Sequence, residues 1–124
     1  LSRVLPMTEQ MVILERVLES AQRLDRQAEA TTLYFMGQIY TAQEEHAQAL
    51  KCYQQYLQIV YELHDRRAEA EALMHIGGAC GALGNVKRAQ ESWRHAMALF
   101  RMIGDPRTAQ LRVWLEALER KLTR

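Results

Sequence analysis

The sequence has few of the features that mark a secreted or membrane protein. It contains two prolines and two cysteines, and the cysteines, Cys52 and Cys80, form no CxxC pair. Both cysteines stand inside helical patterns, which favours buried thiols in a reducing compartment over a disulfide. No apolar run approaches the roughly 20 residues needed to cross a bilayer, and residues 1–10 lack the long apolar segment of a signal peptide. We therefore expect a cytoplasmic protein with no membrane partner.

No charge of one sign dominates the sequence either. Sixteen lysines and arginines face fifteen aspartates and glutamates, for a formal net charge of +1 over 124 residues. No run of like charge is longer than two residues. Proteins that bind nucleic acid usually gather basic residues on one face. Nucleic acid is therefore not an expected partner, and the length suits a single domain with its own core.

Sequence motifs of catalysis, metal binding and cofactor binding are also missing. No glycine-rich phosphate loop or GxSxG motif occurs. No two histidines have the HxxxH spacing of metal ligands; the four are His46, His64, His75 and His95. Glu44 and Glu45 are adjacent acids in an expected loop, where such pairs are usually just solvated. We predict no enzymatic activity, no metal and no cofactor.

What the sequence does contain is an internal repeat. Asp25, Asp65 and Asp105 are evenly spaced along it. Each stands where its carboxylate can accept a hydrogen bond from the first N–H groups of a following helix. Pro106 fits the first helical position, where no N–H is needed. The three aspartates recur with a constant period of about 40 residues, and a period of this length indicates stacked helical units.

Within each unit the apolar residues recur at helical spacing, and no strand pattern is present. The expected helices span 8–23, 26–42, 46–63, 66–82, 86–102 and 106–121. Gly37 and Gly77 fall inside two of them, although glycine in a helix costs about 1 kcal/mol relative to alanine. Their recurrence indicates that a neighbouring helix approaches closely, with a large ring, Tyr53 or Trp93, beside the glycine.

These residues resemble the tetratricopeptide repeat family. The matching positions are Leu33, Met36, Gly37, Tyr40, Ala49, Tyr53 and Tyr56 in one unit and Leu73, Ile76, Gly77, Cys80, Ala89, Trp93 and Ala96 in the next. Tyr56 and Cys80 depart from the usual residue types. The usual period of the family is about 34 residues, shorter than the one here. The longer period and the phrases Leu83-Gly84-Asn85 and Gly104-Asp105-Pro106-Arg107 resemble a sub-group that includes Leu-Gly-Asn repeat proteins, kinesin light chain and the repeat tails of bacterial signalling ATPases.

The resemblance implies an all-α, right-handed solenoid of antiparallel helix hairpins in one domain, 1–124. Residues 26–63 and 66–102 would be two full repeats, and 106–121 a capping helix. Residues 8–23 would be the second helix of a preceding repeat, because their apolar positions match those of 46–63 at a constant offset, with Leu14 at the place of Tyr53. Leu1 stands in place of a start methionine, so we expect a longer parent protein.

The resemblance also places the first helix of each unit along a concave face. Counting from the glycines puts Tyr34, Met74 and Trp114 at one equivalent position. The glycines nearby would leave backbone open to a ligand. The expected groove residues are Tyr34, Gln38, Thr41, Met74, Gly78 and Gly81. Tyr34 and Met74 could instead pack inward, as large residues on a helix usually do.

One known use of the family, the clamping of acidic C-termini, is not expected here. Such repeats carry Lys, Arg and Asn at set groove positions. The corresponding positions hold Tyr34, Gln38, His75, Leu111 and Leu115. The positive charges are missing.

The last expected helix departs from its siblings. Its apolar stripe is Leu111, Trp114, Leu115, Leu118 and Leu122, whereas the positions that should form core are Gln110, Val113, Glu116, Ala117 and Arg120. The helix is either turned, so that the stripe caps the core, or keeps its register and offers the stripe to a partner or a second copy. An exposed stripe of this size is rare in monomers, which favours the cap.

We therefore predict a module that binds a peptide or helix of a protein partner in its concave groove. It would be the terminal part of a larger scaffold or signalling protein. Two alternatives stay open: a homodimer formed through the last helix, and a peptide-sensing arm of a signalling ATPase or transcription regulator.

Overall fold

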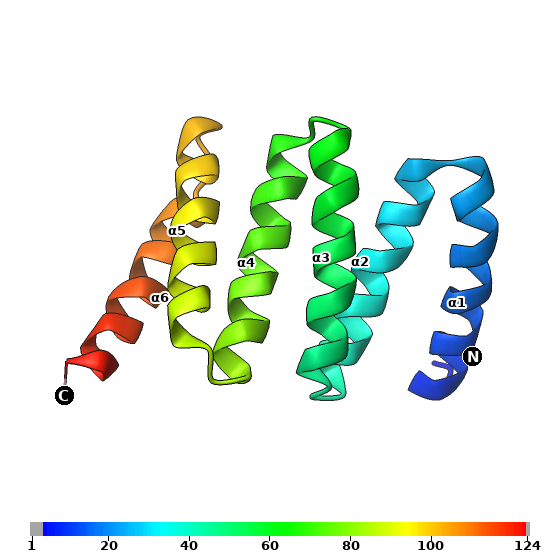
Figure 1. The fold of residues 1–124 in the computed structure, drawn as a ribbon, viewed down its shortest axis with the longest axis horizontal. Coiled ribbons are helices and arrows are strands. Elements are labelled where there is room, and N and C mark those ends of the chain that lie inside the picture. The colour runs from blue at the N-terminus through cyan, green and yellow to red at the C-terminus, as the bar shows by residue number, and fades with distance from the viewer. Residues whose placement is uncertain (1–3, 124) are drawn as a thin grey trace.

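The chain folds into a row of antiparallel helices. The computed structural model describes residues 4–123, and for residues 21–24 it describes the backbone only. Within that range there are six helices and no strand: α1 Met7–Leu24, α2 Arg26–Ala42, α3 His46–Glu62, α4 Arg66–Ala82, α5 Val86–Met102 and α6 Arg107–Leu122. Figure 1 shows them side by side, with the N- and C-terminal ends at opposite ends of the row. The predicted all-α solenoid is confirmed, and each helix begins and ends within one residue of its predicted bounds.

One turn geometry joins the helices from α2 onward. The second residue after the helix has a positive φ in all four turns: Glu44 (59°), His64 (58°), Gly84 (84°) and Gly104 (69°). The next residue's N–H reaches back to a carbonyl five residues earlier, as in Asp65 to Val60 (3.0 Å) and Asn85 to Cys80 (2.8 Å). This left-handed cap satisfies carbonyls that a helix end leaves free. The turns therefore recur at equal intervals along the chain, and α2 to α5 each have 17 residues.

The start of a helix is marked by an aspartate or asparagine at most of these turns. The side chain of Asp25 accepts from the Gln27 N–H (2.9 Å), and that of Asp65 accepts from the Ala68 N–H (3.1 Å). Asn85 does the same for α5. Glu45, before α3, makes no such bond. The predicted capping role of Asp25 and Asp65 is confirmed, since each satisfies an otherwise free donor.

Each hairpin is closed by a glycine that lies under an aromatic ring. A Cβ built on Gly37 would stand 2.6 Å from Cε1 of Tyr53. A Cβ on Gly77 would overlap the indole of Trp93, whose Nε1 donates to the Met74 carbonyl (3.0 Å). The predicted close approach of helix and ring is confirmed. The rings of one hairpin then form the core against which the next helix packs.

The left-handed turns give a first prediction. A non-glycine residue in this conformation is strained by roughly 1–2 kcal/mol. His64→Gly should therefore raise the free energy of unfolding by about 0.5–1 kcal/mol, and Gly84→Ala should lower it by about 1 kcal/mol. No atom lies within 4 Å of a Cβ at Gly84, so only backbone strain acts there. Urea unfolding measures both, and equal stability of His64→Gly and the native chain would contradict the assignment.

Two adjacent glycines in α4 give a second prediction. Gly78→Ala should stabilise the protein by up to about 1 kcal/mol, because nothing occupies the space above it and alanine favours the helix. Gly77→Ala should destabilise it by about 1–3 kcal/mol, because the methyl group would push on Trp93. Thermal unfolding of the two variants provides the comparison. Opposite signs are expected at neighbouring positions with the same chemical change, and a shared sign would rule out the proposed contact.

Candidate binding groove

A hollow of about 230 Å³, here called the central hollow, opens between α2, α3, α4 and α6. Its walls are Thr41, His46, Tyr53, Met74, His75, Gly78, Ala79 and Trp114. Three of the six residues predicted for the groove, Thr41, Met74 and Gly78, therefore line one cavity with Trp114. None of the eight lining residues is a lysine or an arginine.

Gly78 and Gly81 differ in their surroundings. Gly78 is exposed, and no atom lies within 4 Å of the position a Cβ would take. Its backbone is therefore open to close approach by a ligand. A Cβ on Gly81 would instead lie 3.8 Å from the Cβ of Ala89, at the start of α5, and Gly81 does not line the central hollow.

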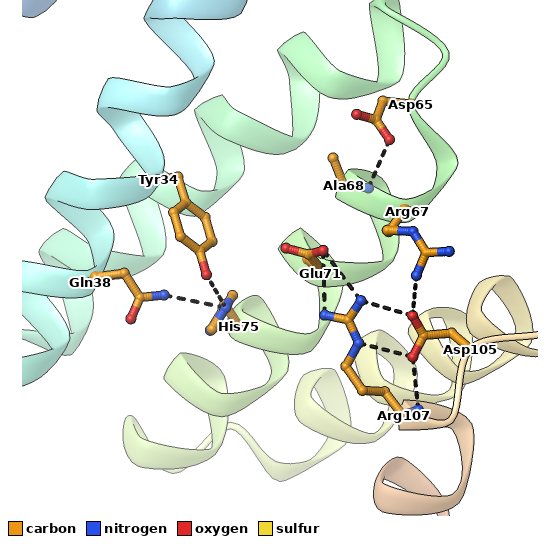
Figure 2. A network of polar contacts seen from close by, with 9 residues as sticks. All are labelled: Tyr34, Gln38, Asp65, Arg67, Ala68, Glu71, His75, Asp105 and Arg107. Atoms are coloured by element: carbon orange, nitrogen blue, oxygen red, sulfur yellow. Dashed lines mark hydrogen bonds and ion pairs between the residues drawn. The ribbon is translucent and has the colours of Figure 1, made fainter. Parts of the chain in front are cut away.

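His75 joins α2, α3 and α4 beneath the hollow. Its Nε2 lies 3.4 Å from the Tyr34 hydroxyl and 3.3 Å from the Gln38 amide nitrogen, and its ring stacks on Tyr53 with centroids 4.8 Å apart. Figure 2 shows Tyr34 and Gln38 converging on the imidazole from α2. An amide nitrogen only donates, so Nε2 accepts and the ring is neutral. Burial, with a smaller effect of the Arg107 charge, lowers the pKa of His75 below 6.5.

Tyr34 and Met74 were each expected either to line the groove or to pack inward, and each does some of both. Tyr34 is half-buried and packs on Tyr56, with ring centroids 5.3 Å apart, while its hydroxyl reaches His75. Burial raises its pKa above 10.0. Met74 is half-buried against the core formed by α4, α5 and α6 and also lines the central hollow. Each residue packs inward with one part and stays accessible with the other.

A second polar network fastens the start of α6 to α4 (Figure 2). The Asp105 carboxylate, 7% exposed, accepts from the Arg107 backbone N–H (2.9 Å), from the Arg107 guanidinium (2.9 Å) and from Arg67. Arg107 also pairs with Glu71 (3.3 Å) and lies over the Phe100 ring. The Arg107 hydrogen bonds hold the Asp105 pKa well below its usual range. Asp105 thus caps α6, as predicted, and links it to the preceding repeat.

The apolar stripe of α6 is divided between core and surface. Leu111 and Leu115 are buried and Leu118 is half-buried, whereas Trp114 is 37% exposed and Leu122 is 53% exposed. Trp114 lies over Trp93, with ring centroids 5.4 Å apart. The positions that would have been core are all exposed: Gln110, Val113, Glu116, Ala117 and Arg120.

The inward face of α6 is displaced around the helix relative to α4. Leu111 is buried, but its counterpart one period earlier, Glu71, is half-exposed. Arg112 is exposed, but its counterpart Ala72 is fully buried. With this shift, Leu111 and Leu115 are buried against the rest of the chain.

Three further features of the described residues concern metal ligands, thiols and membrane spans. No cluster of His, Cys, Asp and Glu there could hold a metal ion. Cys52 and Cys80 are free and buried, and burial raises the pKa of the Cys52 thiol to about 11. A thiol with this pKa is protonated and poorly nucleophilic at neutral pH. None of the helices described has the length and apolar character of a membrane span.

Comparison with known proteins supports the same class of fold. The chain matches no protein-family model and no curated protein. Among solved structures it is similar to the N-terminal domain of stress-induced protein-1 from C. elegans. The TM-score is 0.64 at 16% sequence identity, over 94% of this chain and 99% of that domain. The likeness shows that the two chains share an all-α helical-repeat fold.

The sequence predicts Thr41, Met74 and Gly78, which line the central hollow, but not the other residues that line it. The sequence presents His75 as one of four histidines without metal-ligand spacing and as a position of the carboxylate clamp, and Tyr53 as a packing ring. His46, which lines the central hollow from the start of α3, carried no signal. Asp105 was recognised as a cap, but its contact with Arg67 joins residues far apart in the sequence and has no local signature.

His75 provides a third prediction. Protonation would remove the Nε2 acceptor that Tyr34 and Gln38 share, and the imidazolium would be poorly solvated. Since the folded pKa lies below 6.5, the unfolded chain binds the proton first, and stability falls as pH drops below 6.5. NMR titration of the His75 ring should report a pKa below 6.5 and the Nδ1–H tautomer. A pKa at or above 6.5 would contradict the buried, neutral assignment.

Proposed function

We propose that this chain binds a peptide or helix of a protein partner in the central hollow. The observation that carries the proposal is the open backbone of Gly78, flanked by the half-buried Met74 and the half-exposed Trp114. A glycine here costs helix stability, and among the described residues no atom within 4 Å of a Cβ at this position offers a compensating contact. Room for a ligand explains its presence.

The walls of the hollow indicate the kind of residue it accepts. Met74, Tyr53 and Trp114 are large and apolar, and aromatic and methionine side chains are common at binding surfaces. At about 230 Å³ the hollow is smaller than the roughly 300–1,000 Å³ typical of small-molecule sites. It suits one anchoring side chain of a longer ligand, as in helix-in-groove and extended-peptide recognition.

The electrostatics of the hollow do not favour an acidic C-terminus as ligand. Arg107 is the positive charge that acts on the pKa of His75, and its guanidinium is already bound by Asp105 and Glu71. His75 itself is neutral, since its Nε2 accepts from Gln38. The proposed anchor is therefore an apolar or aromatic residue.

A role in scaffold or signalling assembly and a cytoplasmic location belong to the same proposal and rest on the tetratricopeptide-like fold alone. A symmetric dimer through the whole α6 stripe has less support. Leu111 and Leu115 are buried within the chain itself, so that surface is not available as a continuous stripe. We accordingly propose that α6 serves as the cap of the core.

A selection from a random peptide library tests the binding proposal. Peptides selected on the native chain should bind Gly78→Gln at least about 30-fold more weakly, a loss of about 2 kcal/mol. The added side chain fills the space above α4 and leaves the fold intact, because the position is open. Fluorescence anisotropy with labelled peptides measures both dissociation constants.

Ala98→Gln is the matched control. Ala98 is an exposed residue within α5 and does not line the central hollow, so the same side chain added there should leave affinity unchanged. Peptides that bind all three proteins equally would show that the central hollow is not the binding site.

A further inference from the structure

The central hollow contains a hydrogen-bond donor that has no partner among the described residues. Because Nε2 of His75 accepts from Gln38, the proton of the neutral ring lies on Nδ1. The hydrogen bonds that the described residues make with His75 all reach Nε2. No side-chain nitrogen or oxygen in this part of the chain is buried without a partner, so solvent reaches Nδ1. His75 lines the hollow, and its Nδ1–H is therefore available to a ligand there.

The His75 ring is held in one orientation before any ligand binds. Tyr34 and Gln38 meet its Nε2 from α2, as Figure 2 shows. Its face stacks on Tyr53, which is 1% exposed, with only 13° between the two ring planes. The direction of the Nδ1–H bond is set by these contacts. A donor that is already oriented loses little conformational entropy when a ligand accepts from it.

The two hydroxyl groups among the described walls of the hollow have no proton to offer a ligand. Thr41 Oγ1 donates to the Gly37 carbonyl (2.8 Å), so it accepts in its 3.4 Å contact with the Tyr53 hydroxyl. The Tyr53 proton is thereby used as well. His46, His75 and Trp114 are then the lining side chains with an N–H to offer. Of these, His75 is fixed both by hydrogen bonds and by ring stacking.

An apolar anchor in the hollow would displace the water that reaches Nδ1–H. A donor that is buried without an acceptor weakens binding, because its hydrogen bond to water is lost and not replaced. The ligand must therefore bring an acceptor to His75 together with its apolar side chain. The main-chain carbonyl next to any peptide side chain is such an acceptor.

The need for a main-chain acceptor distinguishes between extended and helical ligands. Inside an α-helix each carbonyl already accepts from the N–H four residues further on and points along the helix axis. In an extended segment the carbonyls point sideways and are free to accept from a binding protein. A hollow with a main-chain donor beside an apolar pocket therefore suits an extended segment.

We propose that His75 is a recognition residue of the central hollow, donating its Nδ1–H to a main-chain carbonyl of an extended ligand segment beside the apolar anchor. This role of His75 rests on the proposed function and narrows it, because it selects an extended segment over a helix. Gly78 lies one turn after His75 on the same face of α4. Its open backbone gives the ligand main chain the room to approach the imidazole.

Amide-to-ester replacement in a peptide selected on the native chain tests this role. Each ester weakens one carbonyl as an acceptor, and the peptide is scanned one bond at a time. At one position the ester should weaken binding to the native chain about 3- to 10-fold. His75→Phe keeps a ring that can stack on Tyr53 but has no N–H, so it should bind both peptides equally. An ester also removes one peptide N–H, but that loss is common to both proteins and cancels in the comparison.

NMR of the native chain provides a second readout that does not depend on the folding of a variant. On binding, the Hδ1 signal of His75 should move downfield and exchange more slowly with water. A peptide labelled with ¹³C at the carbonyl found by the ester scan should show a coupling across the hydrogen bond to Nδ1. An Hδ1 signal that neither shifts nor gains protection would contradict the proposed bond.

Three control variants separate His75 from its neighbours. Tyr34→Phe removes one contact to Nε2 but keeps Nδ1–H, so the ester penalty should persist. His46→Phe and Trp114→Phe each remove one of the other two N–H donors, and the penalty should persist there too, whatever the change in overall affinity. A penalty that disappears in one of these two variants and remains in His75→Phe would overturn the assignment.

The scan also distinguishes this role from the proposed function itself. Peptides that bind as helices, or that show no ester penalty dependent on His75, would overturn the role of His75. If such peptides still bind Gly78→Gln more weakly than the native chain, the central hollow remains the binding site. Peptides that bind Gly78→Gln as tightly as the native chain would contradict both proposals.

Discussion

The left-handed turn that recurs at even intervals along the chain is the constraint on which the rest of the structure depends. It ends α2, α3, α4 and α5 after equal lengths and reverses the chain in the same way each time. Equal helices and equal turns put residues one period apart at equivalent places, so Tyr34 and Met74 stand in one column. Two of these turns use glutamate and histidine instead of glycine, which shows that the geometry is kept even where the residue type opposes it.

Because the turns fix where the helices lie, the side chains between repeats determine whether each contact between repeats is polar or apolar. Between α2 and α4 the contact is polar, with His75 held by Tyr34 and Gln38. Between α4 and α6 the equivalent of His75 is the buried Leu115, and the start of α6 is fastened by the Asp105 network instead. The polar contact needs aligned donors and acceptors and gives specificity, whereas the apolar one needs only matching volumes. The central hollow lies where these two kinds of contact meet.

Most of the fold could be predicted from the sequence, and only part of the site. Helix ends were predictable because aspartate caps, Gly84-Asn85 and Gly104-Asp105 are local signals. The period also predicts one column of Tyr34, Met74 and Trp114, of which Met74 and Trp114 line the central hollow. The side chains brought to the hollow by α3, and the hydrogen bonds of His75, could not be predicted, because they depend on how separate helices pack. The orientation of α6 depended on a small rotation that exchanges the burial of Leu111 and Arg112, and spacing alone allows both outcomes.

The uniform turn also bears on how such a chain changes length over evolutionary time. The turns at Asp65 and Asp105 share their backbone geometry and the returning hydrogen bond, so a segment cut at one could be rejoined at the other. Duplication or loss of the segment between them would leave every turn intact and alter only the side chains at one seam. Selection would then act only on the side chains where the rejoined repeats meet. One such position is the one that holds His75, Leu115 or Phe35.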